Sequence, residues 1–301
     1  MRTLFLINPG SGRKRNADKT DQLIRDIYQK ADRSVETRML DFSQLDAALE
    51  MAIEEGFENI FAVGGDGTVN AIGARLIDKP VNLGVIPNGS GNGFARNLGF
   101  SIKTRLAVTQ SLDARAIKVD TGRFNDIPFL NVAGVGLDAD VAFRFSQGSH
   151  RGLGPYVRST TEGLFGFEPE AFQLEIDGEM HQYDALMGVA IANGTQWGYD
   201  VKITQDASIA DGLLDVIVVK KFPLIKAGLM VRRMVRGDLP DSRYVEVFRA
   251  KKVVIHREKA GTAQVDGEPF ECDRRIEVVV QEKSLNLLLP NTLTPAKIQS
   301  L

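Results

Sequence analysis

The sequence predicts an N-terminal α/β domain built on a parallel sheet, followed by an antiparallel β-sandwich domain. In the first third of the chain, short apolar runs alternate with segments whose apolar residues recur at helical spacing. That alternation is typical of a parallel sheet with helices on both faces. After about residue 115, short β-branched runs between turns dominate, and only residues 223–236 have a clear helical pattern. Many strands with few helices favour a sandwich.

Each element of the first domain can be placed from its apolar pattern and its turn residues. Ser43 is a plausible N-cap for the helix that follows it. We expect strands at 3–7, 35–39, 60–63 and 81–86, and helices at 23–28, 43–53, 69–77 and from 94 onward.

The second domain is expected to consist mainly of strands. Asp177-Gly178 is a strong hairpin signal between two of them. Strands are expected at 117–121, 129–133, 172–176, 186–191, 214–219, 245–249, 253–256, 276–280 and 285–289. The glycine-containing stretch 151–158 reads as a loop. With no low-complexity linker to mark a boundary, we divide the chain into domains at 1–126 and 127–301.

Composition excludes several classes of protein. The 37 Lys and Arg residues nearly balance the 39 Asp and Glu residues, so no overall field requires a nucleic-acid partner. The single cysteine, Cys272, excludes an internal disulfide, and the three scattered histidines show no metal-ligand spacing. The start of the chain lacks a signal-peptide pattern, and no apolar run approaches the ~20 residues that span a bilayer. We therefore expect a cytoplasmic protein, and its oligomeric state is not readable from the sequence.

The segment Gly64-Gly65-Asp66-Gly67-Thr68 lies between an expected strand and an expected helix. Glycines allow close backbone approach to a ligand, and the helix N-terminus that follows favours phosphate. An aspartate here would repel bare phosphate unless a divalent cation bridges the two or the carboxylate handles a proton. The structural alternative is a glycine turn in which Asp66 caps the helix. The segment matches neither a Walker A loop nor a dinucleotide-binding fingerprint.

A second glycine-rich loop, residues 87–96, follows the next expected strand and likewise precedes an expected helix. Two such loops at the carboxyl ends of parallel strands can converge on one ligand at a switch point of the sheet. Ser90 and Asn92 would supply further hydrogen-bond donors. On its own, this loop could equally be a flexible crossover.

The motifs taken in order resemble the diacylglycerol kinase and sphingosine kinase family of lipid kinases, in its bacterial form. The likeness covers nearly the whole chain, through the segments 8–12, 64–68, 87–96, 131–139, 211–215 and 265–268. The resemblance implies a first domain like those of phosphofructokinase and NAD kinase, a β-sandwich second domain, and ATP in the cleft between them.

The resemblance also implies roles for individual residues. Asp66 and Asp120 would belong to a Mg²⁺–ATP network. The residues expected to line the nucleotide are Asn8, Ser11, Gly65, Gly67, Thr68, Ser90 and Gly91.

Two assignments of the general base follow from different members of the family. One places the base at Asp266, with Glu268 beside it, and the other places it at Asp66. We favour Asp266, although Asp266-Gly267 would also read as an ordinary hairpin turn. In bacterial members the aspartate at position 211 ligates a structural metal, which here implies Mg²⁺ held by Asp211 and the carbonyls of Ser208 and Leu213. Asp211-Gly212 is otherwise turn-like, and Asp138 reads as a loop cap.

We therefore predict an ATP- and Mg²⁺-dependent kinase that phosphorylates the hydroxyl group of a lipid, either diacylglycerol or a sphingoid-type acceptor. Gly93 stands where diacylglycerol kinases usually carry Asp, which shifts the expectation slightly away from diacylglycerol. The alternatives are an NAD kinase-like phosphotransferase and a non-catalytic nucleotide-binding regulator. Peripheral contact with the inner membrane face is left open. Its candidate is the helix at 223–236, whose arginines 232, 233 and 236 lie near Leu229, Met230, Met234 and Val235 and otherwise form a solvated face.

Overall fold

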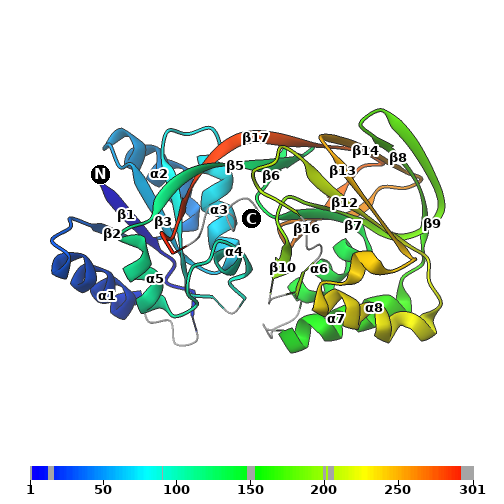
Figure 1. Cartoon of the computed structure of the whole chain (residues 1–301), viewed down its shortest axis with the longest axis horizontal. Coiled ribbons are helices and arrows are strands. Elements are labelled where there is room, and N and C mark those ends of the chain that lie inside the picture. The colour runs from blue at the N-terminus through cyan, green and yellow to red at the C-terminus, as the bar shows by residue number, and fades with distance from the viewer. Residues whose placement is uncertain are drawn as a thin grey trace. The chain divides into compact units, whose positions relative to one another are not determined.

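The computed structural model describes residues 2–12, 17–89, 91–147, 153–198, 201–202 and 207–292. These residues form two compact units, each considered by itself (Figure 1). Unit 1 holds the described residues up to 119 and those from 283 to 292, and unit 2 holds those from 120 to 282. The sequence-based boundary at 126/127 thus falls after the division at 119/120. The sequence also did not predict that the end of the chain returns to unit 1.

Unit 1 is an α/β unit with a parallel sheet in the order β2-β1-β3-β4-β17. The predicted α/β class is therefore confirmed. Its elements are β1 (Thr3–Ile7), α1 (Ala17–Lys30), β2 (Glu36–Met39), η1 (Phe42–Gln44), α2 (Leu45–Glu54), β3 (Asn59–Gly64), α3 (Asp66–Leu76), β4 (Asn82–Pro87), α4 (Gly93–Asn97), α5 (Thr104–Ser111), the first part of β5 (Arg115–Phe124) and the last part of β17 (Arg275–Leu289).

The strand order gives unit 1 a switch point. The chain goes from β1 to β2 on one side and then to β3 on the other side of β1. In sheets of this order, ligands bind outside the carboxyl ends of the strands at such a point. The central strands β1 and β3 are fully buried and largely apolar, as helices on both faces require. Phe5 of β1 stacks on Phe61 of β3 at a ring-centroid distance of 4.6 Å, which fixes the two strands that flank the switch point.

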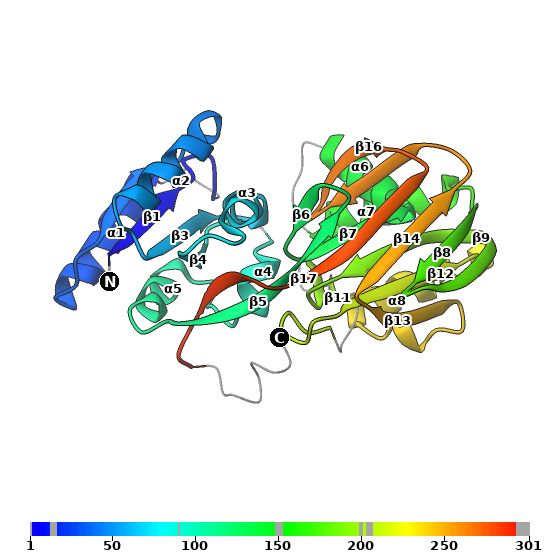
Figure 2. The same ribbon diagram turned by 90° about the horizontal axis from the view of Figure 1, so that it is seen from above.

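Unit 2 is built on antiparallel strands, which confirms the predicted sandwich-like class. The long strand β9 pairs with β8 along its first half and with β7 and β12 along its second half (Figure 2). Its elements are the end of β5, β6 (Ile127–Phe129), β7 (Val132–Gly136), α6 (Leu137–Gln147), α7 (Leu153–Gly166), β8 (Glu170–Ile176), β9 (Glu179–Ala192), β10 (Gln196–Gly198), β11 (Val201–Lys202), β12 (Leu214–Lys220), η2 (Leu224–Lys226), α8 (Ala227–Arg236), η3 (Leu239–Asp241), β13 (Val245–Ala250), β14 (Lys252–Arg257), β15 (Gly261–Val265), β16 (Glu268–Cys272) and the first part of β17.

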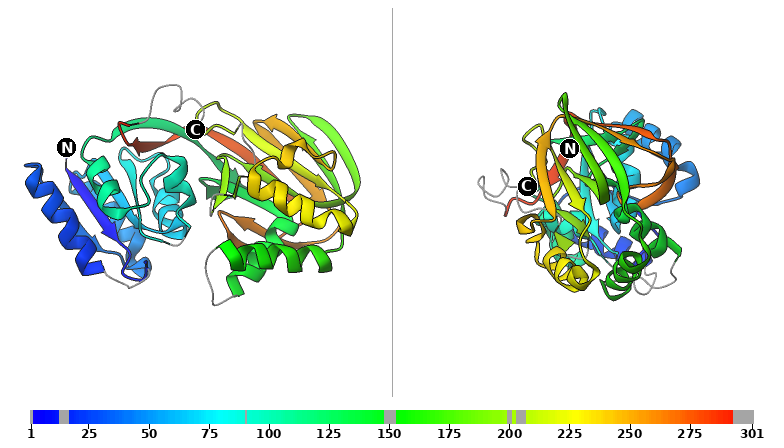
Figure 3. Two further views of the ribbon diagram at one scale, coloured as in Figure 1. Left: turned by 60° about the horizontal axis from the view of Figure 1, so that its bottom comes forward. Right: turned by 90° about the vertical axis from the view of Figure 1, so that its right-hand side faces the viewer.

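The expectation of a single clear helix in the second domain is wrong. Helices α6 and α7 precede β8, and α7 includes part of the stretch 151–158 that reads as a loop. Pro155 is tolerated because it lies in the first turn of α7, where its missing N–H has no intrahelical acceptor. Tertiary packing stabilises α7: Leu164 is buried in a cluster with Ala227 and Met230 of α8. Figure 3 shows α7 and α8 together against the strands of unit 2.

Within the described ranges, no helix is both long enough and apolar enough to cross a membrane.

Candidate active site

The segment after β1 is hydrogen-bonded to the first turn of α3. The Asn8 side-chain amide donates to Thr68 Oγ1 at 2.8 Å, and the Asn8 backbone N–H donates to the Val63 carbonyl at 3.0 Å. Ser11 Oγ donates to the Asn8 carbonyl at 2.9 Å. Asn8, Ser11 and Thr68, which the resemblance assigns to the nucleotide, therefore lie together at the switch point of the sheet.

The second glycine-rich loop packs directly on the first. The Asn88 N–H donates to the Gly64 carbonyl at 2.7 Å, and the Asn88 side-chain amide donates to Ser11 Oγ at 3.1 Å. A Cβ atom on Gly89 would overlap the Cα atom of Gly65. Position 89 therefore requires glycine, and the sequence-based prediction that the two loops converge is seen in the structure.

Asp66 connects the two loops through its carboxylate. Its Oδ1 accepts from the Phe94 N–H in the first turn of α4 at 3.1 Å. The N-cap of α3 is Gly65, and no side chain caps it, so Asp66 does not act as the helix cap that the structural alternative requires. Among the described residues, Oδ2 of Asp66 has no hydrogen-bond partner, and it remains a carboxylate oxygen of the kind that Mg²⁺ prefers.

The structure places the other predicted nucleotide residues of unit 1 in the same two loops. Gly65 is the N-cap of α3 and Gly67 lies in its first turn, and the Gly91 carbonyl accepts a long 3.4 Å hydrogen bond from Arg96. Ser90 lies outside the described residues. Asn88 was not singled out from the sequence, although an amide directly after a buried strand is a usable signal. Asn92 closes its own loop through two hydrogen bonds with the Gly89 backbone, each 2.8 Å long.

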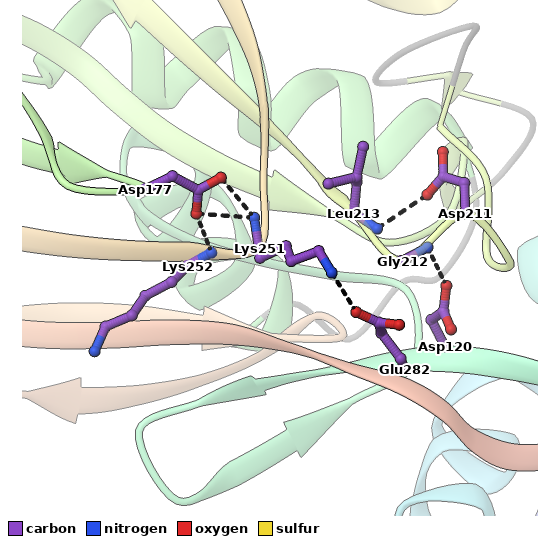
Figure 4. Close-up of polar contacts among 8 residues, drawn as sticks. All are labelled: Asp120, Asp177, Asp211, Gly212, Leu213, Lys251, Lys252 and Glu282. Atoms are coloured by element: carbon purple, nitrogen blue, oxygen red, sulfur yellow. Dashed lines mark hydrogen bonds and ion pairs between the residues drawn. The ribbon is translucent and has the colours of Figure 1, made fainter.

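Asp120 is buried in unit 2, where it holds the loop that contains Asp211. Its side chain is 2% exposed, and Oδ2 accepts from the Gly212 N–H at 2.7 Å (Figure 4). Its backbone N–H donates to the Ile209 carbonyl at 2.6 Å. Asp120, which the resemblance assigns to the Mg²⁺–ATP network, is thus hydrogen-bonded to the loop of Asp211, which the resemblance assigns to a structural metal.

Asp266 occupies a tight hairpin turn between β15 and β16. Asp266 and Gly267 both have positive φ, at 49° and 87°, as a type I′ turn requires. The Asp266 carboxylate accepts three backbone N–H bonds of 2.8–2.9 Å, from residues 130, 131 and 132. A carboxylate has about four acceptor positions, and backbone N–H groups occupy three of those of Asp266. Glu268, the first residue of β16, is exposed.

A buried asparagine that the sequence analysis missed links the backbone of Asp120 to the segment that holds the Asp266 carboxylate. Asn193 is 1% exposed, and its side-chain amide donates to the carbonyls of Asp120 and Leu130, both at 2.9 Å. Since the Leu130 N–H donates to Asp266, one chain of hydrogen bonds runs from Asp120 to Asp266. Its only sequence signal is an Asn-Gly pair at the end of a buried strand.

Asp138 extends this network from the far side of the hairpin turn. Its Oδ2 accepts from the Gln264 amide at 2.6 Å, and Gln264 Oε1 accepts from the Gly267 N–H at 2.8 Å. A Cβ on Gly134 would overlap the Asp138 carboxylate, so glycine is required there. Asp138 also lines a small apolar cavity of about 60 Å³. Burial raises the pKa of Asp138 to about 6, which the Gln264 hydrogen bond only partly offsets. The prediction of a simple loop cap missed this link.

The Asp211 loop presents oxygen donors suited to Mg²⁺, but its carboxylate already has partners. Oδ1 accepts from the Leu213 N–H at 3.1 Å, and Oδ2 forms an ion pair with Arg249. Arg249 also lies 3.4 Å from the buried Asp215 carboxylate. The described residues contain no cluster of three or more His, Cys, Asp or Glu side chains that could hold a metal. The predicted metal ligands are the Asp211 carboxylate and the carbonyls of Ser208 and Leu213, and oxygen atoms of these kinds suit Mg²⁺. Arg249 would compete with the ion for the Asp211 carboxylate.

Lys251 is a second cation beside this loop. Its ammonium donates to Glu282 at 2.6 Å, and Glu282 packs against Gly212 (Figure 4). The hydrogen bond to Glu282 raises the pKa of Lys251, and the nearby charges of Asp177 and Asp120 add to the effect. Internal cations thus offset the carboxylates gathered around Gly212.

The raised pKa of Asp138 predicts a stability that depends on pH. The folded state holds this proton more tightly than the unfolded state, so the free energy of unfolding should fall as the pH rises from about 4 to about 6. Asp138→Asn keeps an acceptor for Gln264 and removes the charge. Two pKa units correspond to about 3 kcal/mol. Because the residue is partly accessible, we expect a gain of about 1–2 kcal/mol above pH 6 and little near pH 4.

Thermal unfolding across pH 4–8 measures this gain, with Asp140→Asn as a control on the same helix. Asp140 pairs with Arg144, so its substitution should not stabilise the protein at any pH. An Asp138→Asn variant that is less stable than wild type throughout the range would contradict the prediction.

The Asp211 loop predicts a graded response to Mg²⁺. If Mg²⁺ binds at Asp211, it raises the melting temperature of the wild type because a ligand stabilises only the state that binds it. Asp211→Ala should abolish this rise. Arg249→Gln removes the competing cation, so the melting temperature should rise at lower Mg²⁺ concentrations than in the wild type. Arg243→Gln controls for the loss of an exposed arginine. A Mg²⁺ response that survives in Asp211→Ala would show that this loop is not the metal site.

Comparison with known families covers both units. The model of the diacylglycerol kinase catalytic domain matches residues 2–124. The model of the YegS C-terminal NAD kinase beta sandwich-like domain matches residues 131–288, which is more than half of the chain.

Individual relatives agree with these matches. The diacylglycerol kinase of Bacillus subtilis (strain 168) is 27% identical over 273 residues, which cover 89% of each chain. That of Staphylococcus aureus (strain MRSA252) is 29% identical over 275 residues, covering 89% of this chain and 86% of the relative. The crystal structure of a diacylglycerol kinase from Bacillus anthracis strain Sterne has the same fold, with a TM-score of 0.76, 19% identity, and coverage of 98% of this chain and 97% of that one. The chain therefore belongs to the lipid kinases that combine a diacylglycerol kinase catalytic domain with a YegS-type C-terminal β-sandwich-like domain.

Proposed function

We propose that this lipid kinase transfers the γ-phosphoryl group of Mg–ATP to the hydroxyl group of a lipid alcohol. The observation that carries the proposal is the pair of glycine-rich loops at the switch point of unit 1, locked together by Asn88 and Asp66. Backbone N–H groups in the first turn of a helix have no intrahelical acceptors, and they bind phosphate well. Asn8, Ser11, Thr68 and Ser90 would line the nucleotide with the glycines at 65, 67 and 91.

Mg²⁺ would be held with the nucleotide by Asp66, whose Oδ2 faces no protein donor among the described residues. Asp120 is assigned to the same network by resemblance. When bound, the ion would offset negative charge on the transferred phosphoryl group. The protein's own contribution is positioning, because phosphoryl transfer requires little covalent chemistry from the enzyme.

The proton of the acceptor hydroxyl would pass to Asp266. Three backbone donors hold its carboxylate in one orientation, as a base that must meet the acceptor hydroxyl requires. A base positioned in this way typically contributes ~10²–10⁴-fold in rate. Glu268 is the neighbouring carboxylate, and Asp66 is the rival assignment for this role.

The acceptor is proposed to be diacylglycerol or a sphingoid-type lipid. The relatives that carry the name diacylglycerol kinase favour the first and speak against the NAD kinase-like alternative. Gly93, which stands where diacylglycerol kinases usually carry Asp, leaves the sphingoid-type acceptor open. Labelled ATP offered with a panel of lipid extracts, followed by mass spectrometry of the product, identifies the acceptor. In a parallel reaction that also contains NAD, labelled NADP in place of a labelled lipid would overturn the proposal.

We expect Asp66→Asn to abolish Mg²⁺-dependent transfer while the protein stays folded. The asparagine oxygen can still accept from the Phe94 N–H, so the contact between the two loops is kept and only the metal-binding charge is lost. Calorimetric titration should show weaker Mg–ATP binding, and the melting temperature should stay close to that of the wild type. Turnover within a few-fold of wild type would end the assignment of this loop to the active site.

We expect Asp266→Asn to lower kcat by about 10²–10⁴-fold and to leave the affinity for ATP nearly unchanged. Its melting temperature should also fall, since an amide NH₂ group cannot accept from the backbone donors that the carboxylate holds. Glu268→Gln is the matched control, because Glu268 is exposed and its replacement should not destabilise the fold. A larger loss of kcat in Glu268→Gln than in Asp266→Asn would move the base to Glu268.

A further inference from the structure

The surface of η2 and α8 carries apolar side chains that no packing requirement explains. Ile225 is 89% exposed, Leu224 is 53% exposed and Leu229 is 44% exposed. Single exposed apolar residues are common on proteins and need no explanation. These three lie within six residues of chain, Leu224 and Ile225 in η2 and Leu229 in the first turn of α8.

The buried side of α8 is distinct from this exposed side. Ala227, Met230 and Met234 are 5–7% exposed, and the first two pack into the core of unit 2. Of the apolar residues that the sequence analysis named near the arginines of this helix, Met230 and Met234 are therefore buried and Leu229 is exposed. The side chain of Val235 lies outside the described residues.

The same surface is strongly basic. Residues 220–237 contain six Lys or Arg and no Asp or Glu, in a chain whose net charge is −2. Lys221, Lys226, Arg232 and Arg236 are exposed, and none forms an ion pair with a residue that the structure describes. Arg232 and Arg236 follow Leu229 by three and seven residues, which places all three on one face of α8.

The helix dipole accounts for only part of this charge. Arginines in the last turn of a helix are favoured by the negative end of the dipole. Lys226 instead occupies the N-cap of α8, where a cation is disfavoured, and Lys221 lies before it. Lys226 is thus placed against the dipole, and neither lysine has an ion-pair partner among the described residues, which favours an external anion.

We propose that this docking face, defined as Leu224, Ile225 and Leu229 with Lys221, Lys226, Arg232 and Arg236, binds the surface of a bilayer that contains anionic lipid. An interfacial helix of this kind inserts its apolar side chains at the level of the headgroups, while its cations meet lipid phosphates. The proposal rests on the proposed lipid kinase function for its biological purpose, since the acceptor resides in a membrane. Its physical content is a binding surface and does not depend on turnover.

The test is cosedimentation of the full-length protein with sucrose-loaded vesicles, in the absence of ATP. Vesicles of phosphatidylcholine alone are compared with vesicles that also contain phosphatidylglycerol. We expect the wild type to prefer the anionic vesicles and to lose that preference as salt is raised. Lys226→Gln with Arg232→Gln should lower the anionic-vesicle partition coefficient about tenfold or more. Ile225→Ser with Leu229→Ser should lower the partition coefficient on both kinds of vesicle.

Matched controls separate this face from general surface effects. Lys30→Gln with Lys259→Gln removes the same charge from exposed positions elsewhere, and Met51→Ser removes an apolar side chain that is 53% exposed on α2. Both should bind vesicles as the wild type does. Melting temperatures should match throughout, because every substituted side chain is exposed.

Three outcomes overturn the proposal: no binding of the wild type to anionic vesicles, wild-type binding by both docking-face variants, or equal loss in the controls. A concentration-dependent dimer that Ile225→Ser dissolves would instead assign the face to a second copy of the chain. Kinase activity on a short-chain, water-soluble acceptor should be unchanged in the docking-face variants. If the wild type itself lacks that activity, the proposed function fails while the vesicle result stands.

Discussion

The close approach of two glycine-rich loops is the constraint on which the site in unit 1 depends. At the carboxyl ends of β3 and β4, Gly89 lies against Gly65 with no room for a side chain between them. This contact aligns the ends of α3 and α4 so that Asp66 can accept from the first turn of α4. The glycines thus serve two purposes, because they let the loops pack together and leave backbone N–H groups accessible to a phosphate.

Unit 2 holds several carboxylates in largely buried positions. A buried charge is costly unless hydrogen bonds compensate it. Asp120 and Asp266 accept from backbone N–H groups, and Asn193 ties the two together through carbonyl oxygens. Backbone donors cannot rotate away as long side chains can, so these carboxylates are held at fixed positions before any ligand arrives. Such preorganisation is what electrostatic stabilisation of a reacting group requires.

Much of the fold and part of the site could be predicted from the sequence. Apolar periodicity located most strands, and glycine motifs located the loops, because both are local signals. Asn193 and Gln264 were missed because their importance arises from contacts with residues distant in the chain. Helix α7 was missed because its glycines and Pro155 lower its intrinsic propensity, and packing against α8 overrides this. Arg249 could not be anticipated as a partner of Asp211, since strand pairing alone brings it there.

The distribution of charge links these observations. The chain is nearly neutral overall, yet carboxylates gather around Gly212 and cations gather on η2 and α8. Around Gly212, Arg249 and Lys251 are paired with Asp211 and Glu282, so the local charge is largely offset within the protein. On the docking face the cations have no such partners among the described residues. Pairing of opposite charges within one domain would lower its electrostatic energy. The fold nevertheless keeps the cations of the docking face apart from the acidic residues. Unpaired charge of one sign is retained where an external partner of the other sign can use it.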